Sequence, residues 1–251
     1  MIFEQPLNEQ MRLYLRLEYL FEELDYFLGR DNFCDHRQVL RLILEILQVI
    51  DRPDLKNRVI QNLVQCRNNL RQLESSEAID LDKLHKTLHE LERLILALQN
   101  NSQKIGLSLR ENEFLASLTQ RLYTPAGTCN FNIPAYQVWL ARPAVERHSQ
   151  LLAWTNEFSI IRNAAAVILK LIRASTTFQP ISITGGLYQR NLNANLDYQL
   201  IRIDLAANPQ LFPELSVSRY RLAIHFFTLD SSFHNKQFTD TVEFNIACCR
   251  L

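Results

Sequence analysis

The chain has 251 residues with 27 basic and 27 acidic side chains, so its formal net charge at pH 7 is zero. Without a net charge the surface as a whole does not attract nucleic acid, and a cationic site has to be built locally from particular arginines. Hydrophobic residues make up 47% of the chain, which suits a globular protein with a sizeable core, and no apolar run reaches the roughly 20 residues that span a bilayer.

The N-terminus and the cysteines indicate the compartment. The stretch MIFEQPLNEQMR has neither the basic nor the apolar region of a secretory signal. The five cysteines are odd in number and too scattered for a disulfide framework. We therefore expect a cytoplasmic protein with reduced thiols and no membrane partner.

The first part of the chain has the apolar spacing of helices. Five apolar residues recur at three- and four-residue steps and predict one buried stripe: Leu13, Leu17, Leu20, Leu24 and Phe27. Asn8 is the expected N-cap of this helix and Gly29 its stop. A second helix is expected over 35–51, and Pro53 suits the first turn of a third.

Two further helices have the clearest pattern in the sequence. The apolar face of the first is formed by Leu55, Val59, Leu63, Cys66, Leu70 and Leu73. After the polar loop ESSEAID, a heptad seam is formed by Leu81, Leu84, Leu88, Leu91, Ile95 and Leu98. Because the loop between them is short, we expect the two helices to pack as an antiparallel hairpin.

The middle of the chain is expected to combine helices with one extended segment. Ser108 and Glu111 have the spacing of a capping box and predict a helix start, and the turn-forming TPAGT ends that helix. The segment 129–143 is rich in β-formers and is broken by Pro134, which predicts an edge strand or an extended crossover. Two helices are expected over 145–173.

Four β-like runs close the chain, joined by turns rich in Gly, Asn, Pro and Ser: 180–188, 198–205, 219–227 and 241–249. Helices first and strands last predict an α+β fold. We expect a mainly helical N-terminal domain that contains the antiparallel hairpin, and a smaller C-terminal β-sheet domain. The expected helical domain spans 1–123 and 143–175, and the expected β domain spans 124–142 and 176–251.

Motifs for common catalytic chemistry are missing. The chain has five glycines and no G-x-x-x-x-G-K-[ST], G-x-G-x-x-G, G-x-S-x-G, H-E-x-x-H or C-x-x-C motif. Nucleotide hydrolysis, acyl transfer and zinc-protease chemistry therefore lose their usual sequence support. We expect a protein that is not an enzyme and that needs no cofactor and no metal.

Two features leave an enzymatic alternative open. His85 and His89 lie four apart on a helix, a spacing that can hold a metal, although both fall outside the leucine seam and surface histidines are favoured. Cys248 and Cys249 could be redox-active or bind a metal with Cys129, although strand-filling thiols are favoured. The alternative function is a metal- or thiol-dependent cytosolic enzyme.

A nucleic-acid-binding module is a further alternative. Residues 101–180 carry 8 basic and 4 acidic side chains. Their aromatic residues do not interleave with Lys and Arg as a stacking platform requires. We therefore expect no nucleic-acid partner.

The run RYRLAIHFF (219–227) predicts a strand with two different faces. Because side chains alternate along a strand, one face is apolar: Tyr220, Leu222, Ile224 and Phe226. The other carries Arg219, Arg221 and His225 around the small Ala223, and such a face either remains solvated or binds a short peptide with acidic and apolar residues. Arg202, on a neighbouring predicted strand, is expected to join this face.

Two arginines lie on one side of the first predicted helix. Arg12 and Arg16 are four residues apart, and Glu9 and Glu18 are placed to pair with them. A solvated, salt-bridged helix face is the default interpretation of this pattern.

Three stretches together resemble the ZapD family of Z-ring-associated division proteins. These are FEQPLNEQMRLYLRLEYL near the start, TPAGTCNFNIPAYQVWL in the middle and SRYRLAIHFF with VEFNIACC near the end. The likeness covers almost the whole chain, in the right order and at compatible spacing. The region of the helical hairpin is the least distinctive part.

The resemblance implies a non-enzymatic, cytoplasmic division factor that acts at mid-cell. Members of this family are homodimers with a helical domain and a smaller β domain. They bind the C-terminal tail of the tubulin-like GTPase FtsZ, cross-link its protofilaments into bundles, support Z-ring and septum assembly, and lower FtsZ GTPase activity.

The resemblance also implies which residues receive the tail. Arg221 falls on a position of the family's basic pocket, and Arg16 and Arg52 coincide with family arginines. Together with the strand and helix patterns, the expected tail-binding residues are Arg221, His225, Arg219, Arg202, Arg16, Arg12 and Arg52.

The sequence departs from the family pattern at three positions. His225 replaces an expected arginine, Glu113 a basic residue and Gln137 a histidine. Because histidine is mostly neutral above pH 7, tail binding is expected to weaken there.

Overall fold

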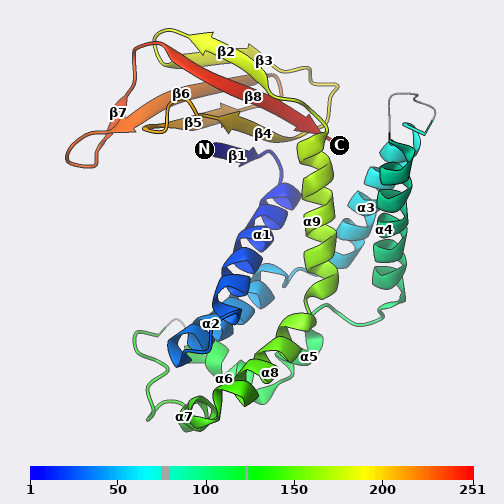
Figure 1. Ribbon diagram of the computed structural model, residues 1–251, viewed down its shortest axis with the longest axis vertical. Helices are drawn as coiled ribbons and strands as arrows, with labels where there is room; N and C mark the ends of the chain where they lie inside the picture. The colour runs from blue at the N-terminus through cyan, green and yellow to red at the C-terminus, as the bar shows by residue number, and fades with distance from the viewer. Residues whose placement is uncertain (75–79, 122–123) are drawn as a thin grey trace. The chain divides into compact units, whose positions relative to one another are not determined.

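A computed structural model describes residues 1–74, 80–121 and 124–251 (Figure 1). The chain divides into two compact units, one made of Met1–Arg12 with Leu169–Leu251 and the other of Leu13–Ile168. We call them the β unit and the helical unit. Helices precede the main β-sheet region, which confirms the predicted α+β class. Within the described ranges, no helix is both long and apolar enough to cross a membrane.

The helices follow one another from residue 9 to residue 174. Their bounds are α1 (Glu9–Leu28), α2 (Phe33–Val49), α3 (Leu55–Arg71), α4 (Leu81–Asn100), α5 (Leu107–Arg110), α6 (Glu113–Arg121), α7 (Pro134–Ala141), α8 (Ala144–Asn156) and α9 (Ser159–Ala174). The predicted cap of α1 is confirmed, because Asn8 Oδ1 accepts a hydrogen bond from the Met11 N–H at 2.8 Å. The predicted pair of helices over 145–173 is also present, as α8 and α9.

The predicted helical hairpin is confirmed. Helices α3 and α4 run antiparallel side by side (Figure 1). Their facing residues are buried: Leu55, Val59, Leu63, Cys66, Leu84, Leu88, Leu91, Leu94, Ile95 and Leu98. Arg71 Nη2 and Glu92 Oε1 form an ion pair between the two helices at 2.6 Å. Most of the intervening loop, 75–79, lies outside the described residues.

The predicted capping box is wrong. Helix α6 begins at Glu113, and its cap is Asn112, whose Oδ1 accepts from the Leu115 N–H at 3.1 Å. Ser108 lies in the short α5, and its hydroxyl donates instead to Glu157 Oε2 at 3.0 Å. Pro53, expected in the first turn of α3, lies in the turn that precedes this helix.

The strand or crossover predicted over 129–143 is also wrong. Pro134 stands in the first turn of α7, where its missing N–H and fixed φ are compatible with a helix. The helical spacing puts Tyr136 and Trp139 on one face, and Trp139 stacks on Trp154 of α8 at 6.4 Å between ring centroids. The segment 124–142, expected in the β domain, therefore lies in the helical unit.

The β unit contains two antiparallel sheets. Sheet A has the order β1 (Ile2–Pro6), β4 (Tyr198–Asp204), β8 (Val242–Arg250), β2 (Gln179–Ile183). Sheet B has the order β3 (Leu187–Asn191), β6 (Arg221–Leu229), β5 (Leu211–Val217), and β7 (Asn235–Gln237) also pairs with β6. The predicted run 180–188 forms two strands around Gly185 and Gly186, and β1, β5 and β7 were not predicted.

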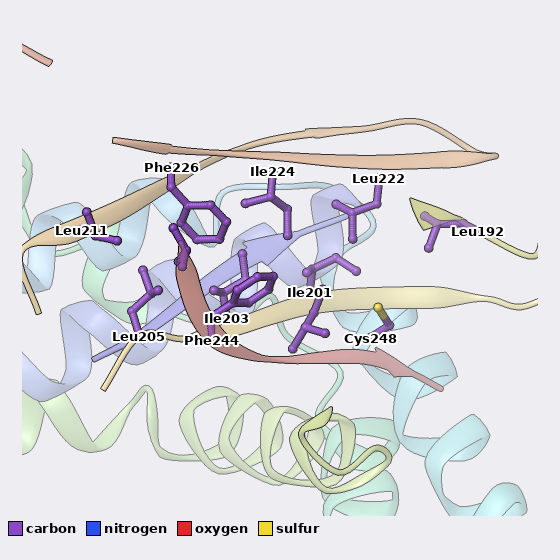
Figure 2. Close-up of a cluster of buried hydrophobic side chains, with 12 residues drawn as sticks. Leu192, Ile201, Ile203, Leu205, Leu211, Leu222, Ile224, Phe226, Phe244 and Cys248 are labelled. Carbon is purple, nitrogen blue, oxygen red and sulfur yellow. The ribbon is translucent and has the colours of Figure 1, made fainter. Parts of the chain in front are cut away.

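The core of the β unit lies between the two sheets (Figure 2). Leu222, Ile224 and Phe226 point inward from β6 and are fully buried, which confirms the predicted alternation. Ile201 and Ile203 contribute the same kind of face from β4. The strand begins only at Arg221, so the preceding tyrosine is not part of this core.

Candidate functional site

The face of sheet B opposite to its core carries the candidate site. We call it the outer face of sheet B. Cross-strand register and alternation assign ten residues of β3, β5 and β6 to it: Leu187, Gln189, Asn191, Phe212, Glu214, Ser216, Arg221, Ala223, His225 and Phe227. The end of β6 and its pairing with β7 add Leu229, Asn235 and Gln237. These strands are separate in the sequence, so only strand pairing brings their residues together.

Arg221 is exposed at the start of β6. Its Nη2 donates a hydrogen bond to Gln189 Oε1 on β3, and its backbone N–H donates to Ser218 Oγ at 3.2 Å. The amide of Gln189 is neutral, so this contact orients the guanidinium without cancelling its charge. A guanidinium held in this way can receive a carboxylate by two parallel hydrogen bonds.

The middle of the outer face is shallow and electrically mixed. Ala223 lies between Gln189 and Ser216, and His225 lies between Leu187 and Glu214. Because Glu214 is the direct cross-strand neighbour of His225, the face is not uniformly cationic, as the sequence of β6 alone had suggested. Glu214 was missed because β5 contains Pro213 and was not predicted as a strand.

An aromatic pair lies toward the other end of the outer face, and Leu229, 50% exposed, follows it on the same side of β6. Phe212 of β5 stacks on Phe227 of β6, with ring centroids 5.9 Å apart and planes inclined by 24°. Both side chains are half-buried. The alternation through Ala223 and His225 continues to Phe227 and could have assigned that ring to the outer face, whereas its partner needed the register of β5.

Arg219 does not lie on the strand where it was predicted. The residue occupies an exposed bend before β6, and its guanidinium carbon lies 5.6 Å from the centroid of the Tyr220 ring. The prediction failed because the extended backbone starts two residues later. Arg219 is therefore at the rim of the outer face, next to the end that holds Arg221.

Arg202 does not join the outer face. It lies on β4 of sheet A, with its side chain on the side away from the core between the sheets. Its Nε donates to Glu4 Oε1 at 2.8 Å, and the same carboxylate accepts from Arg173 Nε at 2.9 Å. The guanidinium also lies 5.0 Å from the Phe178 ring. Arg202 is thus a structural ion-pair residue, and its predicted place beside Arg221 is wrong.

The remaining predicted arginines are spread over both units. Arg12 pairs with Glu9 in the first turn of α1, as expected for a salt-bridged helix face. Arg16 is exposed on α1 in the helical unit. Arg52 is half-buried in the turn between α2 and α3, where it lines a cavity of about 390 Å³ together with Lys56. Within one unit, the structure therefore brings together only Arg221 and His225, with Arg219 at the rim.

Two of the positions at which the resemblance implied a departure from the family pattern lie in the helical unit. Glu113 is the first residue of α6. Gln137 lies on α7, and its Nε2 donates to the backbone oxygen of Thr128 at 3.3 Å.

The histidine pair on α4 is exposed. This agrees with the surface position that was favoured because both residues lie outside the leucine seam. His85 and His89 both face away from the buried leucines. Among the described residues, the group that could hold a metal is a different one, formed by Asp31, His36 and His148, whose ligand atoms lie within 4.8 Å of one another.

Arg147 determines which chemistry this second group can have. Its Nε–H donates to His36 Nδ1 at 3.1 Å, so a neutral His36 carries its proton on Nε2. A protonated Nε2 has no lone pair for a metal. The guanidinium beside it disfavours a cation further.

The thiols of β8 have the surroundings of core residues. Cys248 and Cys249 are buried, and burial raises the pKa of both, for Cys249 to about 11. Protonated thiols are poor nucleophiles and poor metal ligands. Cys129 belongs to the helical unit. These features agree with strand-filling thiols rather than a reactive pair.

Comparison with known proteins gives one consistent result. The model of the family described as "ZapD: Cell division protein" matches residues 15–225. A protein named Cell division protein ZapD from Coxiella burnetii (strain RSA 331 / Henzerling II) is 40% identical over 251 residues, covering 99% of this chain and 97% of its own length. Proteins of the same name from Cupriavidus metallidurans and Dechloromonas aromatica are 36% and 37% identical, covering 99% and 89% of this chain and 98% and 88% of their own lengths.

Proposed function

Since the chain belongs to the ZapD family of cell division proteins, we propose that it acts in division by binding the C-terminal tail of FtsZ. As a homodimer it cross-links FtsZ protofilaments into bundles, which supports Z-ring and septum assembly and lowers FtsZ GTPase activity. It does so without catalysing a reaction of its own, in the cytoplasm at mid-cell.

The observation that carries this proposal is the setting of Arg221. Its guanidinium is exposed on β6, the strand between β3 and β5, and is oriented by the neutral amide of Gln189. A flexible tail with acidic residues offers the carboxylate that this fork binds best. His225 lies on the same face and adds a further hydrogen-bonding group.

Three further arginines are proposed to act on the tail. Arg219 lies at the rim of the outer face, and Arg16 and Arg52 in the helical unit coincide with family arginines. We propose that these three add electrostatic attraction to the tail. Arg12 and Arg202 are assigned to internal ion pairs with Glu9 and Glu4.

Bundling depends more on the presence of two tail-binding sites in one molecule than on a high affinity at each site. A symmetric dimer carries one tail site per subunit, so one molecule can hold two filaments. A filament displays many tails, and each weak contact is reinforced by the high effective concentration of the next tail. An affinity in the micromolar range, about −8 kcal/mol, is sufficient.

The test is co-sedimentation of FtsZ filaments with the wild-type chain and with Arg221→Glu. The reversal of charge should reduce co-sedimentation at least about tenfold, the equivalent of 1.4 kcal/mol. Arg250→Glu changes an exposed arginine of sheet A and serves as the matched control, with binding like the wild type. Undiminished binding by Arg221→Glu, or undiminished binding to FtsZ without its tail, would contradict the proposal.

A further inference from the structure

We propose that the outer face of sheet B recognises two features of an extended peptide at once. Arg221 binds a carboxylate at one end of the face, and the Phe212–Phe227 pair binds an apolar side chain at the other. This inference rests on the proposed function, because it describes how the same face selects its partner.

The register of β6 sets the distance between the two ends. Arg221 and Phe227 are six positions apart and lie on the same face, since side chains of a strand alternate. At about 3.3 Å per residue, their Cα atoms are roughly 20 Å apart along the strand. An extended peptide that lies over the outer face along β6 has about the same rise, so its acidic and apolar residues should also be about six positions apart.

The middle of the face leaves room for a backbone. Ala223 has only a methyl side chain, and its cross-strand neighbours are polar, Gln189 on β3 and Ser216 on β5. This is the shallow stretch over which an extended chain can pass. The polar side chains there can hydrogen-bond to peptide groups without specifying a sequence.

The aromatic end supplies the apolar contact. The stacked rings of Phe212 and Phe227 are half-buried, so part of each ring remains exposed. Leu187, 38% exposed, lies on the same face opposite His225. Covering these groups with an aliphatic or aromatic side chain removes apolar area from water, which an acidic residue at this end cannot do.

Glu214 decides which end receives the acid. Its carboxylate is exposed next to His225 and between the two ends of the face. A peptide carboxylate over the middle would meet this like charge, whereas one at Arg221 would not. The partner is therefore a peptide whose apolar residue and acidic residue are separated by a neutral stretch.

The experiment measures fluorescence anisotropy of the labelled FtsZ tail peptide with the full chain. Phe212→Ala and Phe227→Ala should each weaken binding about five- to tenfold, since a buried aromatic contact of this kind is worth that much. Phe233→Ala is the matched control, because Phe233 is 82% exposed in the turn between β6 and β7 and belongs to none of the strands that form the face. Its binding should equal that of the wild type.

A second arm keeps the test independent of folding defects. The apolar residue of the peptide is replaced by serine, and both peptides are titrated against wild type and Phe227→Ala. The serine peptide should bind the wild type several-fold more weakly, yet lose little further affinity on Phe227→Ala. Equal losses on both proteins would overturn the inference.

The outcomes separate this inference from the proposed function. If Arg221→Glu abolishes binding while both phenylalanine variants bind normally, the inference is wrong and the tail function stands. If the wild-type chain does not bind the tail peptide, both are wrong.

Discussion

Arg221 and Arg202 illustrate how the same residue type acquires different tasks. Arg221 is exposed and hydrogen-bonded to a neutral amide, so its charge is available to a partner. Arg202 is mostly shielded, with its side chain 15% exposed and held by Glu4. The difference depends on which side chain the fold places beside each guanidinium, because both arginines lie on strands with similar alternation.

Glu4→Gln should destabilise the β unit without changing the tail site. The carboxylate of Glu4 is 16% exposed and accepts hydrogen bonds from two arginines, so its loss leaves two shielded cations without an anion. We expect the free energy of unfolding, measured in urea, to fall by about 2 kcal/mol. Tail affinity of the folded fraction should remain unchanged.

Glu214→Gln is the control, because we expect it to leave stability almost unchanged and to change the tail affinity instead. Glu214 is exposed, so its replacement should change the unfolding free energy by no more than about 0.5 kcal/mol. Removing a negative charge next to the tail should raise affinity about two- to threefold, a change of well under 1 kcal/mol. A large loss of stability in this variant, or none in Glu4→Gln, would contradict these assignments.

At the scale of elements, a buried polar cluster joins α2 to α8. His36 of α2 is fully buried and accepts from Arg147 of α8, whose guanidinium also donates to the backbone oxygens of Leu140 and Arg142. Burial, Arg147 and His148 lower the pKa of His36, while Asp31 and the backbone of Arg30 raise it by less. The contact therefore requires the neutral imidazole.

The helical unit should lose stability in mild acid. Because the pKa of His36 in the folded state lies below its ordinary value of 6.5, the unfolded chain binds the proton more tightly. The stabilisation is complete above that value and is lost progressively as the pH falls below it. Thermal unfolding between pH 7 and pH 5 should show this decline.

His36→Gln removes the titrating group and keeps an acceptor for Arg147, so its stability should depend less on pH over this range. His89→Gln changes an exposed histidine and should retain the wild-type slope. Identical slopes for wild type and His36→Gln would show that another group is responsible.

At the scale of the whole molecule, the proposed bundling depends on a weak tail-binding site that is present twice in a dimer. The guanidinium of Arg221 is exposed, so salt should screen its proposed contact with a tail carboxylate. The proposed apolar contact at Phe212 and Phe227 should depend little on salt. The two parts of the site should therefore respond differently to ionic strength.

Raising salt from about 50 to 300 mM should loosen FtsZ bundles, because the Debye length falls over that range. Light scattering of filaments with the wild-type chain should decline, and the residual binding should be sensitive to Phe227→Ala. A variant that is monomeric in solution should still bind the tail peptide but fail to bundle. Bundling by such a monomer would contradict the cross-linking mechanism.

Much of the helical part was predictable from the sequence, because helix signals are local. Asn8 caps α1 through contacts within one turn, and the leucine steps of α3 and α4 predict most of their buried faces. Leu73, beyond the end of α3, and Leu81, at the start of α4, are exposed, so the prediction is wrong at these two ends. The alternation in β6 likewise assigned Arg221 and His225 to one face. In each case the residues that interact lie within a few positions of one another, or follow one period along a single element.

Only the tertiary structure determined which strands pair with one another and which side chains each arginine contacts. Glu4, Arg173 and Arg202 meet although they are far apart in the chain, and Glu214 reaches His225 only through the register of an unpredicted strand. Pairing between distant strands leaves no periodic mark in the sequence, because it depends on which edges the fold brings together. For the same physical reason, the sequence by itself identified a cationic strand and its family, whereas the mixed and aromatic character of the outer face required the structure.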